Sequence, residues 1–277
     1  MSWIAETMFG FDTETTSVDV ETARIVQIAQ VMADARNRTT TQDVQLINAG
    51  VDIPEGASAI HGITTERMRA EGLDPKKVLE HYADELSSAM AGGTPIVGMN
   101  LAYDFTLFDR ELRRHGLRTL DARLGRAIGP VVDVYVLDKL CDPWRPTKNS
   151  GGRKLGAMAK HYGVRLDNAH DAGADALASC RIAWQMVTWG SKPVEFFLQF
   201  PHVQNSKKQT SDQAARDLHR NYQRLTEIDL VQLHQAQIKA KRKQDAELRD
   251  HFAKQGKPCD ADGLWPMRPY KPAAVKA

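Results

Sequence analysis

Two acidic residues, Asp12 and Glu14, stand two positions apart at the end of a hydrophobic run, in the stretch "MFGFDTETTS". In a β-strand, residues i and i+2 point to the same face, so both carboxylates would project together where the strand ends. Adjacent carboxylates repel each other, and each raises the pKa of the other. A divalent cation removes that conflict, and oxygen ligands suit Mg²⁺ or Mn²⁺. For this short pattern alone, an exposed acidic strand end is the alternative.

Two later segments carry residues of the same chemistry. Asp104, in "NLAYDF", follows a short apolar stretch at the expected start of a helix. His170 and Asp175, in "HDAGAD", stand at the start of the last apolar helix of the body, where both can face the same sheet edge. The structural alternatives are a helix cap for Asp104, a surface histidine for His170 and a partner of the helix dipole for Asp175.

The elements around these residues predict an α/β fold. The expected strands are 3–14, 24–34, 43–51, 94–100 and 129–137, and residues 53–64 are expected to form a loop. The expected helices of the body are 74–93, 105–116, 155–163 and 171–190. The first helix is the best marked, because Asp74 can cap it and Pro75 occupies its first position. An antiparallel meander followed by alternating strands and helices indicates a mixed sheet flanked by helices.

The motifs "FDTETT", "IPEGASAIHGIT", "NLAYD" and "HDAGAD" follow one another in an order that resembles the DnaQ-like exonucleases. The resemblance covers about residues 4–190. It is to the DEDD nucleases whose fourth motif is H-x-x-x-x-D, the DEDDh subgroup, which includes proofreading subunits of bacterial DNA polymerase III. This resemblance implies a ribonuclease H-like mixed sheet flanked by helices, with a C-terminal helical extension.

The resemblance also implies the site and its cofactors, two divalent ions, Mg²⁺ or Mn²⁺. The implied metal ligands are Asp12, Glu14, Asp104 and Asp175. His170 is the implied general base, and Glu14 counts as catalytic as well as metal-binding. The implied substrate-binding residues are Thr15, Thr16, His61, Asn100 and Tyr103. An imidazole with an ordinary pKa of about 6.5 suits a general base near neutral pH.

The implied reaction is hydrolysis of single-stranded nucleic acid from its 3′ end, DNA in the first place, with release of nucleoside 5′-monophosphates. Two metal ions can stabilise the charge that develops on the phosphate. Three roles stay open, namely proofreading beside a DNA polymerase, free-standing DNA trimming and trimming of RNA ends. The alternative from another class is a catalytically silent module that binds nucleic acid or acts as a polymerase-associated scaffold.

The 277-residue chain is expected to divide into an exonuclease domain (1–192), a linker (193–210) and a basic helical extension with a flexible end (211–277). Residues 206–277 carry a net charge of +6, and residues 1–205 a net charge of −4. This asymmetry indicates an acidic body that holds cations and a tail that meets polyanions. The basic cluster 239–243 could contact single-stranded nucleic acid. Alternatively, an apolar stripe from Leu218 to Leu233 packs on the body or on a polymerase.

Apolar runs and cysteine spacing indicate the cellular compartment in which we expect the protein. No apolar run approaches the roughly 18 residues that a membrane span needs, so we expect no membrane contact. The three cysteines, Cys141, Cys180 and Cys259, are far apart, and none belongs to a C-x-x-C pair. A disulfide framework or a zinc site is therefore not expected, and the cytoplasm is the expected compartment.

Overall fold

A five-stranded mixed sheet forms the centre of the computed structural model, which describes residues 3–5, 7–147 and 152–271. The strand order is β3-β2-β1-β4-β5. The strands are β1 (Thr7–Thr15), β2 (Ile25–Asp34), β3 (Thr39–Leu46), β4 (Ile96–Gly98) and β5 (Val131–Asp133). The first three form an antiparallel meander, while β4 runs parallel to β1 and β5 parallel to β4. The prediction of an α/β fold with a mixed sheet is confirmed.

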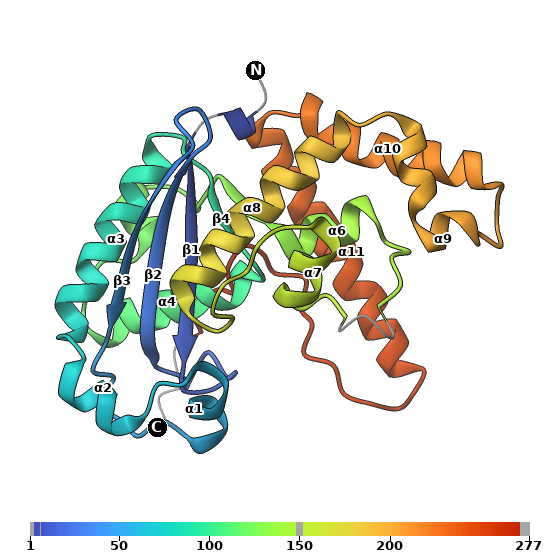
Figure 1. Cartoon of the computed structure of the whole chain (residues 1–277). Coiled ribbons are helices and arrows are strands. Elements are labelled where there is room, and N and C mark those ends of the chain that lie inside the picture. Colours follow the sequence, from blue (N-terminus) through green and yellow to red (C-terminus); the bar gives the residue numbers. More distant parts are fainter. Residues whose placement is uncertain (1–2, 6, 148–151, 272–277) are drawn as a thin grey trace.

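Helices cover both faces of the sheet. In Figure 1, α8 (Ala172–Gly190) crosses in front of the strands, and α3 (Pro75–Ala91) and α4 (Leu101–Arg114) lie behind them. Side chains of β1 alternate between the two cores, with Met8 in the cluster that contains α8 and Phe9 in the cluster that contains α3 and α4. A Cβ on Gly10 would lie 2.9 Å from the Ala176 carbonyl oxygen and from Cys180 Sγ, so the close approach of α8 to β1 requires a glycine there.

The remaining helices surround this sandwich. They are η1 (Trp3–Ala5), α1 (Glu55–His61), α2 (Thr65–Glu71), α5 (Leu120–Leu124), α6 (Val134–Cys141), α7 (Leu155–Tyr162), η2 (Val194–Gln199), α9 (Pro201–Gln204), α10 (Ser211–Glu227) and α11 (Leu230–Ala253). In the residues that the structure describes, no helix is both long and apolar enough to span a membrane.

Several local predictions are wrong. Residues 3–5 of the first expected strand form η1, and the helix expected from residue 105 begins at Leu101. The expected strand 129–137 ends at Asp133, because the Asp133 carboxylate accepts the N–H of Tyr135 at 3.0 Å and starts α6 instead. The expected loop 53–64 contains α1, which begins after Pro54 and ends at Gly62 with φ +71°. The third strand lies at 39–46 rather than 43–51, because its ladder with β2 starts directly after the turn, at Thr39.

The C-terminal helices pack on the same chain. The stripe residues Leu218, Tyr222, Leu225 and Leu233 are buried in the core cluster that contains α8. The Tyr222 hydroxyl lies 2.9 Å from that of Tyr162 on α7, so α10 is joined to the body by a buried polar contact as well. The domain boundaries at residues 192 and 210 stay a prediction. Residues 272–277 of the predicted flexible end lie outside the described residues.

After α11 the chain returns to the sheet as a segment without helix or strand, residues 260–271, which we call the C-terminal strap. The Trp265 indole N–H donates to Asp133 Oδ2 at 3.2 Å, and the Arg268 N–H donates to Thr106 Oγ1 at 2.9 Å. The guanidinium of Arg110 donates to the backbone carbonyls of Arg268 and Pro269. These contacts fix the strap along the start of α6 and along α4.

Candidate active site

The carboxyl end of β1 brings Asp12 and Glu14 to the face that α8 covers. Both lie an even number of positions from Met8, so their side chains share its face of the strand, and Met8 packs in the core with α8. The Asp171 carboxylate caps α8 by accepting the N–H of Ala174 at 3.0 Å. The N–H of Ala172 donates to the Gln27 side chain of β2 at 3.0 Å, so the first turn of α8 is fixed beside the strand ends.

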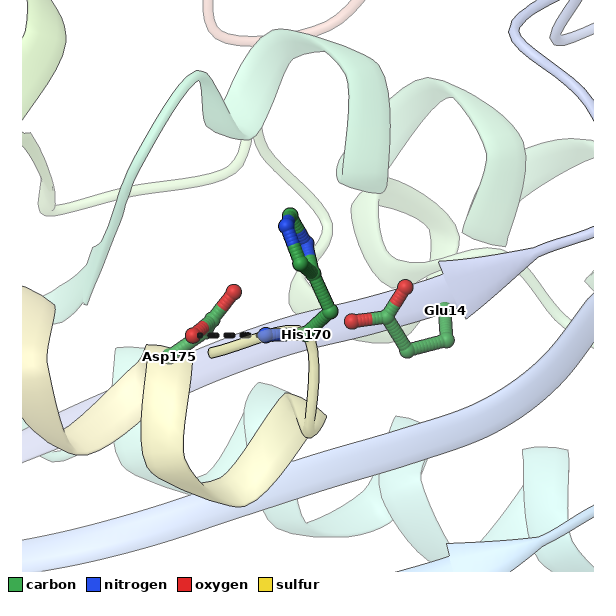
Figure 2. Close-up of side chains that lie close together, drawn as sticks. All are labelled: Glu14, His170 and Asp175. Carbon is green, nitrogen blue, oxygen red and sulfur yellow. Dashed lines mark hydrogen bonds between the residues drawn. The ribbon is translucent and has the colours of Figure 1, made fainter. Parts of the chain in front are cut away.

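Glu14, His170 and Asp175 lie close together at this junction. Each offers one ligand atom, and these atoms all lie within 4.8 Å of one another. Figure 2 shows His170 between the two carboxylates, with its backbone N–H donating to Asp175 Oδ1 at 3.4 Å. His170 has a φ of +70°, a left-handed conformation that is uncommon outside glycine. The loop therefore holds the exposed imidazole over the buried Asp175 carboxylate.

Asp104 reaches the site from the first turn of α4. Asn100 precedes this helix with a φ of +61°, and its N–H donates to Asp133 Oδ1 at 2.9 Å. The N–H of Leu101 donates to Asp133 Oδ2 at 3.1 Å, so one buried carboxylate fixes the start of α4. The Asp104 side chain is itself buried, and its Oδ1 accepts the Thr13 hydroxyl of β1 at 2.7 Å.

Burial raises the pKa values of all four predicted metal ligands, and repulsion from neighbouring carboxylates adds to it. Burial, followed by the charges of Asp175 and Asp104, raises the pKa of Glu14 to about 8. Burial raises the pKa of Asp104 to about 7 and that of Asp175 to about 6, the latter opposed by the His170 N–H. The pKa of Asp12 is also well above its ordinary value, through burial and then the charge of Asp104.

This donor set suits divalent cations. Carboxylates whose mutual repulsion raises their pKa values are stabilised in the charged form by a nearby positive ion. Oxygen donors are the ligands that Mg²⁺ and Mn²⁺ prefer. The four carboxylates that the sequence singled out come from β1, α4 and α8, and the charges of Asp104 and Asp175 raise the pKa values of both Asp12 and Glu14. Their assignment as ligands stays a prediction.

Most of the predicted substrate-binding residues border one cavity of about 830 Å³ beside these carboxylates. It is lined by Glu14, Thr15, His61, Asn100, Tyr103 and His170, among others. The Tyr103 hydroxyl bonds to the Thr15 hydroxyl at 2.7 Å, and burial raises the Tyr103 pKa to about 12. Burial likewise lowers the pKa of His61.

Thr16 is the exception among them. Its buried hydroxyl accepts the N–H of Arg24 at 2.9 Å, and its own N–H donates to the Arg24 carbonyl at 3.0 Å. Thr16 therefore closes the loop between β1 and β2, and its N–H is already engaged. The role of all five residues toward a substrate stays a prediction.

Three residues that support the site were not singled out from the sequence. Thr13 orients Asp104, Asp133 fixes the start of α4, and Asp171 caps α8 while its charge raises the pKa of Glu14. Asp171 could have been found, because it directly follows His170 at a marked helix start. Thr13 and Asp133 act across 91 and 33 positions, so no local pattern indicates their partners.

Known proteins resemble this chain in sequence. The family model described as RNase T, exonuclease, matches residues 9–183. DNA polymerase III PolC-type of Lacticaseibacillus paracasei is 29% identical over 172 residues, which are 61% of this chain and 10% of that protein. The PolC-type polymerase of Streptococcus thermophilus is 27% identical over 173 residues, 62% of this chain and again 10% of that protein. The chain thus spans about a tenth of the length of these curated relatives.

Solved structures resemble it in fold. Exonuclease I of E. coli in complex with a dA16 oligonucleotide has a TM-score of 0.52 and 22% identity, covering 66% of this chain and 41% of that one. Exonuclease I from Methylocaldum szegediense has a TM-score of 0.55 and 21% identity, covering 76% and 50%. At these identities the likeness concerns the fold, the sheet and its flanking helices.

Proposed function

The chain belongs to the RNase T exonuclease family, whose members include the DEDD exonucleases, and from that premise we propose that it is a metal-dependent 3′→5′ exonuclease. The proposed substrate is single-stranded nucleic acid, DNA in the first place, and the proposed products are nucleoside 5′-monophosphates. The observation that carries the proposal is the meeting of Glu14, Asp175 and His170 beside a cavity large enough to admit a strand end.

We assign Asp12, Glu14, Asp104 and Asp175 as the residues that would hold two ions of Mg²⁺ or Mn²⁺. Their raised pKa values support this assignment, because four crowded carboxylates are costly to ionise without a positive partner. Bound divalent ions would supply charge stabilisation for the phosphate and would acidify nearby water.

His170 is assigned the proton transfer. Its imidazole is exposed toward the cavity, while its backbone is held by Asp175. An imidazole beside carboxylates can accept a proton from the attacking water near neutral pH. On the cavity wall, Tyr103 and Thr15 are joined by a hydrogen bond, so they form a preformed surface for the terminal nucleotide.

We further propose that the substrate is DNA and that a DNA polymerase is a partner. The relatives named above are DNA polymerases, and one related fold was solved with a DNA oligonucleotide, which supports DNA over RNA. The relatives also make a DNA polymerase a candidate partner, although this chain covers a tenth of their length. A cytoplasmic location stays a prediction.

A degradation assay tests the proposal. A 5′-labelled strand incubated with Mn²⁺ should shorten one nucleotide at a time, and the same strand labelled at its 3′ end should release labelled mononucleotide at once. Asp12→Ala is the control and should abolish both signals. Single-stranded DNA, mismatched duplex and short RNA, compared in parallel, separate the three possible roles. If the unmodified protein releases nothing while it still binds the strand, the silent scaffold is the correct alternative.

A further inference from the structure

The cavity beside the catalytic carboxylates continues onto a second wall. The residues of this wall come from α6, the start of α7, α11 and the strap. They include Tyr135, Lys139, Lys154, Lys241, Leu264 and Arg268, together with the acidic Asp245, Asp260 and Asp262. Figure 1 shows α6, α7 and α11 grouped on one side of the strands. The match to the exonuclease family ends at residue 183, so α11 and the strap lie outside the matched residues.

The cations of this wall fall into two classes. Lys241 Nζ lies 2.7 Å from Asp245 Oδ1, and Arg268 Nε lies 3.1 Å from Asp262 Oδ2, so both are neutralised within the protein. Lys139 and Lys154, in contrast, make no ion pair with any residue that the structure describes. The Nζ of Lys139 lies 4.5 Å from the centroid of the Tyr135 ring, and Lys154 is exposed.

The wall is held rigidly. The buried Asp245 carboxylate accepts the N–H of Gly263 at 3.0 Å as well as binding Lys241, and it therefore joins α11 to the strap. Trp265 joins the strap in turn to Asp133 at the start of α6. These contacts fix the backbone of α6, α11 and the strap, so this part of the wall loses little backbone entropy when a ligand binds.

We propose that Lys139 and Lys154 bind backbone phosphates of the single strand that precede the 3′-terminal nucleotide. This inference rests on the proposed function, because the carboxylate end of the cavity defines where the strand terminates. Four carboxylates and two divalent ions together carry no net charge, so attraction for the strand beyond its terminal phosphate has to come from other cations of the cavity. Two lysines bind phosphates without reading bases, so the interaction is independent of sequence. Of the basic cluster 239–243, only Lys241 borders the cavity, and it is already paired.

The test is the affinity of the full-length protein for a labelled oligothymidylate of about 12 nucleotides, measured by fluorescence anisotropy with Ca²⁺ from about 50 to 200 mM salt. The double variant Lys139→Gln/Lys154→Gln should bind about tenfold more weakly at the lowest salt. The slope of log affinity against log salt should fall by about 1.4, because each single-strand phosphate that a lysine neutralises adds roughly 0.7 to it. Lys139→Arg/Lys154→Arg should restore both quantities.

The matched control is Lys76→Gln/Lys77→Gln, which removes the same charge from exposed positions of α3, outside the cavity. Weaker binding by the cavity variant alone supports the inference, even if the protein proves not to cleave. If both double variants show equal affinity and an equal salt slope, the inference is overturned. Continued nucleotide release by the protein would in that case leave the proposed function intact. An oligouridylate of the same length should show an equal decrease, because phosphate is the shared group. If the affinity falls for the oligothymidylate but not for the oligouridylate, or the reverse, the phosphate assignment is overturned.

Discussion

The hydroxyl of Thr13 donates a 2.7 Å hydrogen bond to Oδ1 of Asp104, 91 positions further along the chain. Thr13 lies between Asp12 and Glu14, and its side chain therefore points to the opposite face of β1, toward the start of α4. The end of β1 thus presents the carboxylates of Asp12 and Glu14 on one face. Through Thr13, on its other face, it orients the carboxylate of Asp104. The bond also lowers the pKa of Asp104 against the larger effect of burial.

Thr13→Val should lower the rate of nucleotide release about 10–100-fold, the range typical when a group that orients a metal ligand is removed. The substitution keeps the shape of the side chain and removes only the hydroxyl. Thr13→Ser retains the donor and should retain most of the activity. Single-turnover rates of the three proteins provide the comparison, with thermal melting as the check on folding. Equal activity in Thr13→Val would show that Asp104 does not need this hydrogen bond.

His170→Ala should lower turnover about 10²–10⁴-fold, the usual contribution of a general base. Affinities for metal and for oligonucleotide should change much less, because the imidazole is assigned only the proton transfer. Isothermal titration with Mn²⁺, next to single-turnover rates, separates the two effects. Comparable decreases in affinity and rate would instead identify His170 as a ligand or a structural residue.

The metal-free protein should lose stability as the pH rises. The folded-state pKa of Glu14 is about 8 against an ordinary value of 4.5, so the folded state binds more protons than the unfolded state between these values. The free energy of unfolding therefore decreases with pH across this window. Urea denaturation at pH 6 and pH 8 in EDTA should show the decrease. Excess Mg²⁺ binds the charged carboxylates and should reduce it. Identical pH profiles with and without Mg²⁺ would contradict the metal assignment.

Glu14→Gln should stabilise the metal-free protein at pH 8 while abolishing exonuclease activity. The amide cannot ionise, so the repulsion with Asp175 and Asp104 disappears. One pKa unit corresponds to about 1.4 kcal/mol, but Glu14 is only partly buried and solvent screens its charge. We therefore expect a rise of about 1–2 kcal/mol in the free energy of unfolding, less than the whole pKa shift would give. Denaturation in EDTA measures it, with the exposed Glu85→Gln as a charge-matched control. A destabilised Glu14→Gln protein would mean that this carboxylate makes favourable contacts without metal.

Local sequence signals predicted much of the fold. Asp74 accepts the N–H of Lys77 at the start of α3, as the Asp-Pro pair indicated, and β2 and α8 lie within a residue of the expected bounds. The valines after Asp133 favour a strand by propensity, yet a single capping bond turns residues 134–141 into a helix. A local bond from a side chain to the backbone thus outweighed β propensity at that point.

The site shows the same division between local and distant information. The four carboxylates and His170 could be chosen from short motifs at element ends, because each motif keeps its chemistry in a few consecutive residues. The second wall could not be chosen in this way. Trp265 meets Asp133 across 132 positions, and Lys139 lies on a helix that was expected to begin as a strand. Such contacts depend on how the whole chain returns to the sheet.

The central claim is that acidic side chains from β1, α4 and α8 together hold two divalent ions beside His170. Anomalous diffraction from a crystal soaked with Mn²⁺ and a nucleoside 5′-monophosphate tests it most directly. We predict two manganese peaks among Asp12, Glu14, Asp104 and Asp175, and the disappearance of at least one of them in Asp104→Asn. Well-ordered carboxylates without any peak between them at saturating Mn²⁺, or peaks only elsewhere on the protein, would contradict the claim.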